Sequence, residues 1–311
     1  MDASDGDTNN IGYASVFHSY PGITTSVSCL AARPHSCAPQ DDFWAIDRDA
    51  NILWGHEALK AGVQHLVLVA TFEGRDSRSV SEFSAAKEEA VDILQQECTA
   101  TGAKFTVIRP NAYFKDLTDM AFDGVLAYNR HIVLGSGLHR INPVAREDVA
   151  RFMVDCIQQR RHGEFPVGGP DIFTFAEIGA LAAQIIHGTT NNIHSIRVLC
   201  IPLWTLRLHA GVLDTLGRVS RSARRQAAFL HWMVYCSTHD AIAPCRGTLS
   251  LQDHYKQKLA AIKYKQSLRN NPHDDRNMTA LWRKPSFGLS LTALVLLAAA
   301  MIWQLFYSRQ N

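Results

Sequence analysis

The sequence has no excess of charge of either sign, because its 311 residues carry a formal net charge of only +2. Nothing in this balance indicates the basic surface that a nucleic-acid partner would need. The seven cysteines contain no CxxC pair, and the fourteen histidines show no HxxxH or HxH spacing with carboxylates. We therefore expect reduced, mostly structural thiols, structural or surface histidines, and no metal site.

The first residues lack a targeting signal. The stretch MDASDGDTNNIG (1–12) is acidic and polar, with no apolar core and no Arg-rich face. It is therefore predicted to be neither a secretory signal nor a transit peptide.

A glycine-rich turn is also lacking, since no GxGxxG or GxxGxxG occurs upstream of Thr24. A dinucleotide-binding sheet normally begins with a strand, such a turn, and a helix whose N-terminus receives the pyrophosphate. We therefore expect that roughly 60 to 70 residues, about two βα units, precede this segment in a complete fold, and that Met1 is not the biological start.

What the sequence does contain is one long apolar run, SFGLSLTALVLLAAAMIWQLFY (286–307), in which only Gln304 is strongly polar. About twenty residues at about 1.5 Å each span a bilayer core of about 30 Å. Arg283 and Lys284 precede the run. The pattern predicts a C-terminal transmembrane helix that anchors the chain by its tail, with the remainder on the cytoplasmic or stromal side. The alternative is a buried core helix.

Upstream of that run, short apolar segments alternate with helix-length amphipathic ones, which is typical of an α/β layer fold. Strands are predicted at 24–31, 65–71 and 104–110, with helices at 46–62 and about 80–101 between them. Strands that alternate with helices in this way form a parallel sheet, and ligands bind beyond the carboxyl ends of such strands. Those ends carry residues 28–32, 70–73 and 109–114.

The second half is less regular, and its predicted elements are strands at 129–137, 164–169 and 194–202 and helices at 146–160, 173–188, 203–216 and 221–237. Thr174 is a plausible N-cap. The predicted organisation is a Rossmann-like parallel sheet, N-terminally truncated, followed by a smaller α/β substrate region and the membrane helix. Its predicted bounds are 1–128 for the incomplete NAD(P)-binding domain, 129–265 for the substrate region, 266–285 for a linker and 286–307 for the helix.

Several segments, in order from Val27 to Tyr255, resemble a known family: VSCLAAR (27–33), SEFSAAKEEAV (81–91), VIRPNAYFKDL (107–117), GSGLHRINPVAREDVARFMVDC (135–156), FPVGGP (165–170) and APCRGTLSLQDHY (243–255). They are similar to segments of the atypical short-chain dehydrogenase/reductases of the NmrA-like branch, and within it to the divinyl chlorophyllide a 8-vinyl reductases. The resemblance implies an NADPH-dependent reductase of a conjugated vinyl group on a tetrapyrrole, in chlorophyll biosynthesis at a plastid membrane.

Phe83 and Lys87 have the spacing of the Tyr-x-x-x-Lys pair of short-chain reductases, with phenylalanine in place of tyrosine. The resembled family carries phenylalanine there too. Hydride added to a vinyl group leaves negative charge spread over the macrocycle, so a strong local acid is less necessary than in carbonyl reduction. The resemblance implies that Lys87 is catalytic, bonds the nicotinamide ribose and places its charge near the hydride donor. The alternative is a solvated lysine in an AKEEA helix.

The remaining candidates lie at the predicted strand ends. With Lys87, the expected cofactor-binding residues are Ser28, Cys29, Leu30, Ala70, Thr71, Pro110 and Asn111. The expected substrate residues are Tyr113, Phe114 and Lys115, whose aromatic rings could stack on a flat ligand. The alternatives are a plain buried strand, core aromatics and an exposed lysine. Asp47 and Asn51 fall one turn apart at a helix start, where an Asp also simply favours the helix dipole.

Two further functions stay open from the sequence. One is a non-catalytic, membrane-tethered scaffold or redox sensor, as in other NmrA-like chains and a respiratory complex I accessory subunit. The other is a reductase of a different conjugated or carbonyl substrate.

Overall fold

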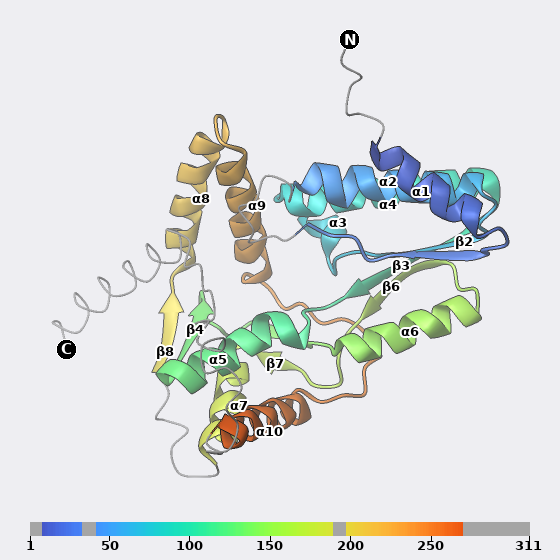
Figure 1. The fold of residues 1–311 in the computed structure, drawn as a ribbon. Helices are drawn as coiled ribbons and strands as arrows, with labels where there is room; N and C mark the ends of the chain where they lie inside the picture. The colour runs from blue at the N-terminus through green and yellow to red at the C-terminus, as the bar shows by residue number, and fades with distance from the viewer. Residues whose placement is uncertain (1–7, 33–41, 189–196, 270–311) are drawn as a thin grey trace.

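The computed structural model describes residues 8–32, 42–188 and 197–269. At its centre is a four-stranded sheet in the order β1-β2-β3-β6, in which every neighbouring pair is parallel (Figure 1). The strands are β1 (Thr25–Ser28), β2 (His65–Val69), β3 (Lys104–Pro110) and β6 (Gly163–Val167). The predicted α/β fold with a parallel sheet is confirmed, and β3 has the predicted bounds.

The fourth strand, β6, comes from the segment predicted to belong to the substrate region. It pairs with β3, so that Ile108 lies opposite Phe165. The residues of a short apolar strand do not specify which sheet edge it joins, because that depends on which edge is left free by the other elements. The sheet therefore contains strands from both sides of the predicted boundary at residue 128. The division into domains stays a prediction.

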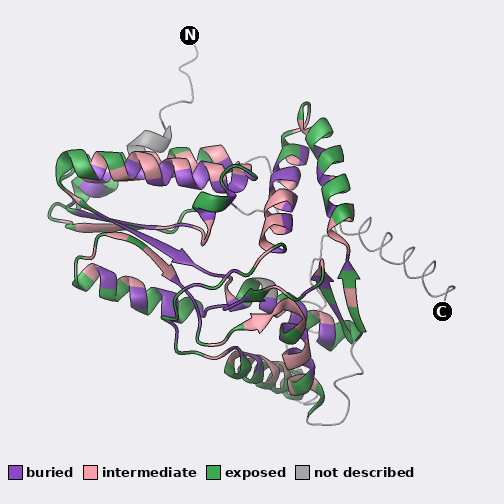
Figure 2. Ribbon diagram, turned by 180° about the vertical axis from the view of Figure 1, so that it is seen from behind, coloured by how far each residue is buried: buried purple, intermediate pink, exposed green. Residues whose placement is uncertain are grey.

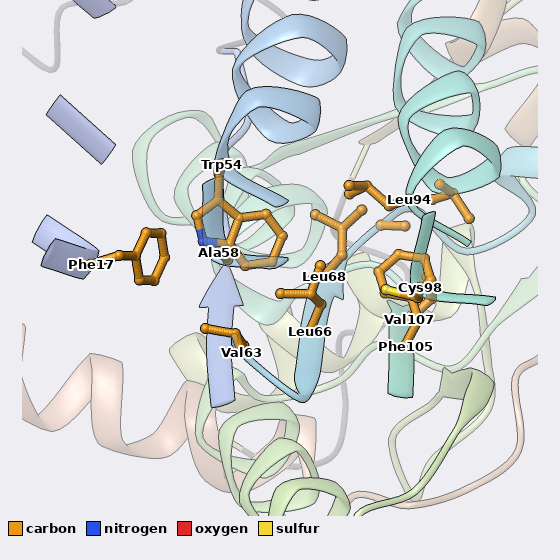
Figure 3. Packing of buried hydrophobic residues seen from close by; sticks show 12 residues of the cluster. Phe17, Trp54, Ala58, Val63, Leu66, Leu68, Leu94, Cys98, Phe105 and Val107 are labelled. Carbon is orange, nitrogen blue, oxygen red and sulfur yellow. The ribbon is translucent and has the colours of Figure 1, made fainter. Parts of the chain in front are cut away.

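Helices cover both faces of the sheet: α1 (Thr8–Ser19), α2 (Asn51–Lys60) and α4 (Glu82–Thr101) lie over one face and α6 (Arg146–Gln158) over the other. The two central strands are buried on both faces, as Figure 2 shows by colour. Leu66 and Leu68 pack against the α2–α4 layer, where Trp54 and Leu94 meet them (Figure 3). Val67 and Ile108 face the α6 layer. Burial on both faces explains why β2 reads as a continuous apolar run.

The predicted helix at 46–62 is divided into a π-helical segment, η1 (Trp44–Ala50), and α2. The helix α4 ends as predicted at Gly102, whose φ of 74° is the left-handed conformation that glycine adopts at low cost. A one-turn helix, α3 (Gly74–Ser77), precedes α4 and was not predicted. The η1 segment matters for the site because it carries Asp47.

The second half forms a smaller α/β layer below the sheet in Figure 1. Its strands are β4 (Arg130–Leu134) with β8 (Arg197–Ile201), which are parallel, and β5 (Arg140–Ile141) with β7 (Phe173–Thr174), which are antiparallel. Its helical segments are η2 (Phe114–Thr118), α5 (Asp119–Tyr128), α7 (Phe175–His187) and α10 (Leu251–Arg269). Thr174 is the N-cap of α7, as predicted, and forms a reciprocal capping box with Glu177.

A helical hairpin of α8 (Leu203–Gly217) and α9 (Arg221–Cys236) stands beside the sheet layer. It is attached to α4, where the Ser81 hydroxyl donates a hydrogen bond of 2.7 Å to the Ala228 carbonyl of α9. Among residues 8–32, 42–188 and 197–269, no helix is long and apolar enough to cross a bilayer. The predicted membrane helix at 286–307 lies outside the described residues.

Candidate functional site

The carboxyl ends of β1, β2 and β3 lie side by side, as the sequence predicts, because the strands are parallel and in register, with Ser28 opposite Leu68 and Val69 opposite Ile108. The helix α4 runs along these ends. Its consecutive residues Lys87 and Glu88 are both buried, and they reach different strand ends. These two residues divide the region into a part around β1 and a part around β3.

At the end of β1, the Lys87 amine is held by two acceptors. Its Nζ lies 2.8 Å from Oδ1 of Asp47 and donates to the Leu30 carbonyl at 2.5 Å. The side chains of Lys87 and Asp47 are 4% and 0% exposed. Lys87 is therefore not a solvated helix lysine, and its amine points at the predicted 28–32 segment. An ammonium group has three donors, so one N–H remains for a further partner.

Asp47 and Asn51, which sequence reasoning treated only as helix-start residues, form the base of this arrangement. Oδ2 of Asp47 accepts from the Ala32 N–H at 3.0 Å. The Asn51 amide donates to the Asp47 carbonyl at 3.0 Å, and its oxygen accepts from the Ser28 hydroxyl at 2.6 Å. Burial raises the pKa of Asp47, although the Lys87 ammonium and the Ala32 N–H oppose that shift. The spacing of Asp47 and Asn51 was visible in the sequence, but their partner could not be read from it.

Phe83, one turn before Lys87 on α4, is buried in an aromatic cluster. Its ring meets Phe43 edge-on at 5.3 Å and Trp232 of α9 edge-on at 5.4 Å, measured between ring centres. The position that would carry the tyrosine of a Tyr-x-x-x-Lys pair is therefore filled by apolar packing. Any proton donor at this site must come from another residue or from water.

The predicted cofactor residues around β1 and β2 differ in exposure. Ser28 is buried and bonded to Asn51, whereas Cys29 and Leu30 are exposed next to the Lys87 amine. Burial raises the pKa of the Cys29 thiol, and the Lys87 ammonium partly offsets this shift. At the end of β2, Ala70 is buried and Thr71 is half-buried. Cys29, Leu30 and Thr71 therefore form the accessible part of this edge.

At the end of β3, the predicted residues point in several directions. Pro110 is buried in the strand, and the Asn111 amide donates to Asn142 and to the Ala241 carbonyl at 2.7 and 2.8 Å. Phe114 is buried against His254, and Lys115 is exposed. Asn111 and Phe114 therefore contact the second half of the chain. Contact of any of the four with a cofactor or substrate stays a prediction.

Tyr113, another predicted substrate residue, packs against the buried cluster on the α6 side of the sheet. It is half-buried and close enough to Cys29 for their charges to interact. Burial, with contributions from Cys29 and Asp116, raises the pKa of its phenol to about 12. The hydroxyl of Tyr113 is therefore protonated at neutral pH and is a weaker acid than that of an unburied tyrosine.

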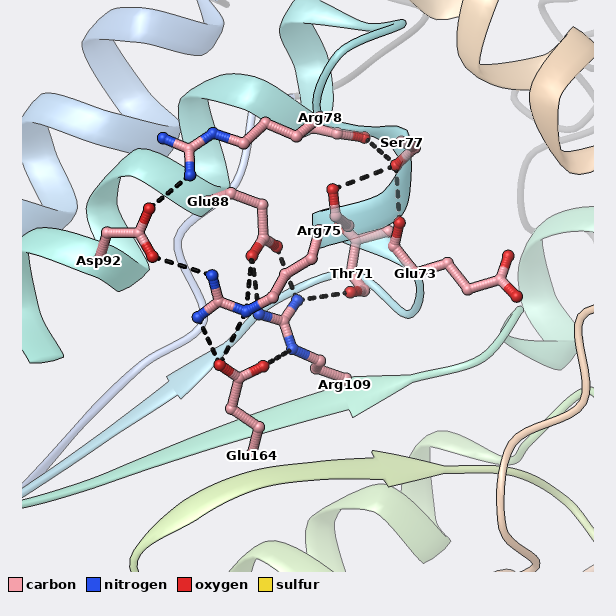
Figure 4. A network of polar contacts seen from close by, with 11 residues as sticks. Thr71, Glu73, Arg75, Ser77, Arg78, Glu88, Asp92, Arg109 and Glu164 are labelled. Atoms are coloured by element: carbon pink, nitrogen blue, oxygen red, sulfur yellow. Dashed lines mark hydrogen bonds and ion pairs between the residues drawn. The ribbon is translucent and has the colours of Figure 1, made fainter.

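Glu88 reaches the other part of the edge, where it forms a buried ion pair with Arg109 at the end of β3 (Figure 4). The pair is bidentate, with Nη1–Oε1 at 2.6 Å and Nη2–Oε2 at 2.7 Å. Arg109 also donates to Glu164 of β6 at 2.5 Å and to the Thr71 carbonyl at 2.9 Å. We call Glu88, Arg109 and Glu164 the Arg109 cluster. It ties α4, β3 and β6 together, and sequence reasoning missed it.

Two surface hollows lie away from the strand ends. A hollow of about 320 Å³ lies along α7 and includes Phe173, Glu177 and Leu181. Another of about 210 Å³ lies between the start of α4 and the hairpin, and includes Glu82 and Arg224. Within the described part of the chain, no group of three His, Cys, Asp or Glu residues is placed to hold a metal.

Comparison with curated proteins finds similarity to plant reductases. The chain is 25% identical over 240 residues to the chloroplastic divinyl chlorophyllide a 8-vinyl-reductase of Arabidopsis thaliana, which covers 74% of this chain and 52% of that protein. It is 27% identical over 215 residues to the enzyme of the same name from Zea mays, covering 64% and 51%. The chain thus spans about half the length of the curated relatives it matches. No protein-family model matches.

Comparison with solved structures finds the same fold in nucleotide-sugar enzymes. A dTDP-glucose 4,6-dehydratase from Bacillus anthracis, solved in complex with NAD, has a TM-score of 0.56 at 11% identity, covering 83% of this chain and 78% of that one. A UDP-glucuronic acid 4-epimerase from Bacillus cereus, also with NAD, has a TM-score of 0.54 at 10% identity, covering 81% and 78%. The predicted resemblance to divinyl chlorophyllide a 8-vinyl reductases is confirmed, and the fold is Rossmann-like.

Proposed function

We propose that the chain is a nicotinamide-dependent reductase of a conjugated carbon–carbon double bond, with NADPH as hydride donor and a divinyl tetrapyrrole as substrate. We further propose that residues 286–307 hold it at a plastid membrane. The similarity to plant vinyl reductases supports the reaction. The NAD-bound enzymes that share the fold support the cofactor class. The observation that carries the proposal is the buried Lys87 amine at the end of β1, beside exposed Cys29 and Leu30.

The residues at this edge fit the ribose end of a nicotinamide nucleotide. Asp47 and the Leu30 carbonyl fix the Lys87 amine and leave one N–H for a ribose hydroxyl. The carboxylate balances the ammonium charge, so the buried pair is neutral before a ligand arrives. Cys29, Leu30 and Thr71 provide the open ledge on which a flat ring can rest.

The proposed reaction turns a vinyl group into an ethyl group. The cofactor supplies a hydride, which would form a C–H bond at the terminal vinyl carbon while the π bond breaks. The electron pair then spreads over the macrocycle, and a proton must reach the neighbouring carbon. Water is the proposed source of that proton, because Phe83 has no hydroxyl and burial makes the Tyr113 phenol a weaker acid than usual.

The test is a titration of the full-length chain with NADPH and with NADH, read as nicotinamide fluorescence. Saturable quenching or enhancement supports the reductase. A silent titration contradicts it and favours the scaffold or sensor function, in which the Lys87–Asp47 pair is purely structural. A second assay follows the conversion of divinyl to monovinyl chlorophyllide by chromatography. If nucleotide binds but no conversion occurs, the proposed cofactor stands and the proposed substrate is wrong.

A paired variant tests the role of Lys87 in that binding. Lys87→Met/Asp47→Asn removes both charges together and keeps an acceptor for the Ala32 N–H, so it avoids an unpaired buried carboxylate. We expect it to fold, by near-UV circular dichroism, and to lose nucleotide binding at least tenfold. Lys104→Met, at the opposite end of β3 on the surface, is the matched control and should bind as the unaltered chain does. Unchanged binding by the paired variant would contradict the role of Lys87.

A further inference from the structure

One side of α8 presents an exposed row of large apolar side chains. Trp204, Leu208, Val212 and Leu216 follow one another at intervals of four residues, and the first two are 57% and 64% exposed. Val219, just after the helix, is 89% exposed. Single exposed apolar side chains are common on soluble proteins, but a contiguous row marks a surface that is covered by something else.

These exposed residues do not lie on the side of α8 that packs against the rest of the protein. At about 100° per residue, the side chains from Trp204 to Leu216 occupy an arc of about 120° on the helix. The side chains Leu206, Ala210 and Leu213 lie on another arc, and they are buried in the cluster shared with α9. In Figure 2 the outer side of α8 is coloured as exposed. The hairpin is therefore complete without the row.

Positive charge borders this row on one side. Arg207 and Arg218 project about 60° and 40° away from Trp204, on the side opposite to Leu208. Both are exposed, and neither forms an ion pair with any described residue. The only acidic side chain of the α8–α9 hairpin is Asp214, which lies 2.9 Å from His231. Asp214 projects within about 40° of both arginines. Residues 203–236 carry five arginines against this single carboxylate, so the charge of the hairpin is positive overall.

We propose that this side of α8 lies in the headgroup region of an anionic lipid bilayer. An apolar arc with tryptophan at one end and arginines along its border is the composition of helices that rest in the plane of a membrane interface. The row from 204 to 219 is about 22 Å long at 1.5 Å per residue. A second copy of the same face would bring more arginines than carboxylates, whereas anionic headgroups complement the excess positive charge.

The proposal does not depend on the reductase function, since it rests only on α8. It is compatible with the predicted membrane helix at 286–307, which would keep the body of the chain near a bilayer. It differs from that prediction because a surface contact of α8 would fix which side of the body faces the membrane. That orientation can be measured in the full chain whether or not the tail is inserted.

The experiment reads the position of Trp204 directly. The full-length chain is reconstituted in vesicles of phosphatidylcholine with or without one third phosphatidylglycerol, with bromine on the acyl chains as a contact quencher. The chain has six tryptophans, so Trp204→Phe should remove up to about a sixth of the emission, and that fraction should be quenchable only in the unaltered chain. Equal quenching of the two proteins would overturn the proposal.

The charged border is tested with a matched pair of double variants. Arg207→Gln/Arg218→Gln should lower the Trp204-dependent quenching in anionic vesicles to its level in phosphatidylcholine alone. Lys263→Gln/Lys265→Gln removes the same charge from the exposed surface of α10, distant from α8, and should change nothing. If Trp204 is shielded in detergent in a concentration-dependent way, a second copy covers the row and the lipid proposal is wrong.

Discussion

Two buried cations stand at the strand ends, and they are held in different ways. Arg109 lies between the carboxylates of Glu88 and Glu164 and donates a further bond to the Thr71 carbonyl. Lys87 has a single carboxylate, Asp47, and one carbonyl, that of Leu30. A planar guanidinium in a bidentate pair is fixed in orientation, whereas an ammonium on a flexible stem can turn to a new acceptor. Arg109 is therefore fixed between elements of the fold, whereas Lys87 keeps the freedom that the proposed nucleotide binding requires.

The neighbours of the two cations support this division. The Arg109 cluster continues to the surface through Arg75, which bonds Asp92 at 2.9 Å and also Glu164. Each charged group in this series of ion pairs is paired with another side chain of the protein. Lys87, in contrast, lies directly beneath exposed Leu30 and beside exposed Cys29. Accessible residues thus lie next to the Lys87 pair, as the proposed nucleotide binding requires.

The largest expected effect comes from breaking the Arg109 cluster. Arg109→Met leaves the Glu88 carboxylate, whose side chain is 0% exposed, without its bidentate partner. Nε of Arg75 lies 3.9 Å from this carboxylate, too far for a hydrogen bond. Removing one member of a buried ion pair typically costs about 3–5 kcal/mol, because the remaining charge stays desolvated. We expect a loss of that size in the free energy of unfolding, measured by urea denaturation. The double variant Arg109→Met/Glu88→Leu should recover much of it, and a single variant as stable as the parent would contradict the structural role.

Lys87→Met should cost less, about 2 kcal/mol at neutral pH, because the remaining carboxyl can neutralise itself. Burial already raises the pKa of Asp47, and loss of the ammonium removes an influence that lowers it. The carboxyl therefore binds a proton more readily in the folded variant than in the unfolded chain, so the deficit should shrink as the pH falls from 8 to 5. Denaturation at the two pH values measures this change, and a deficit independent of pH would show that Asp47 does not take up the proton.

The sequence predicted the region in which both cations lie but not their partners. Parallel strands must place residues 28–32, 70–73 and 109–114 at one edge, so the position of the ledge follows from element order alone. The spacing of Lys87 from Phe83 predicted that Lys87 lies at this edge. The carboxylates that fix the cations are Glu88 of α4, Asp47 of η1 and Glu164 of β6. The positions of the last two depend on the π-helical turn and on the pairing of β6 with the free edge of β3. Neither is encoded in a local pattern.

Two histidines are buried without a carboxylate partner, in contrast to Lys87 and Arg109. They show that a basic group without such a partner has a lowered pKa and loses its charge. The Thr106 hydroxyl donates to the Arg161 carbonyl, so it accepts from Nε2 of His65 at 2.8 Å. Nδ1 of His65 has no hydrogen-bond partner among the described residues. Burial lowers the pKa of His65 from 6.5, and Lys104 and Arg160 lower it further. Burial likewise lowers the pKa of His131. Both side chains are therefore neutral in the fold.

This neutrality predicts a loss of stability in acid. The unfolded chain binds protons at these positions near pH 6.5, before the folded chain does, so stability is complete above that pH and falls as the pH drops below it. Each histidine contributes a slope of at most about 1.4 kcal/mol per pH unit. His65→Gln should flatten the decline between pH 6.5 and 5, measured by urea denaturation. His18→Gln, at an exposed position in α1, is the control, and an equal effect of both variants would contradict the assignment.

The smallest effect is expected at the surface end of the Arg109 cluster, and it separates the buried pair from its extension. The Arg75 side chain is 44% exposed, so solvent screens its ion pairs with Asp92 and Glu164. Exposed ion pairs contribute about 0–1 kcal/mol. Arg75→Gln keeps a donor and should therefore lower the free energy of unfolding by less than about 1 kcal/mol, several-fold less than Arg109→Met. High salt should reduce the difference in free energy of unfolding between Arg75→Gln and the parent, because added salt screens the exposed ion pairs that the parent retains. If Arg75→Gln were as damaging as Arg109→Met, Arg75 and the Arg109 cluster would act as one cooperative network. The cluster would then differ from the Lys87–Asp47 pair in the number of coupled residues rather than in burial.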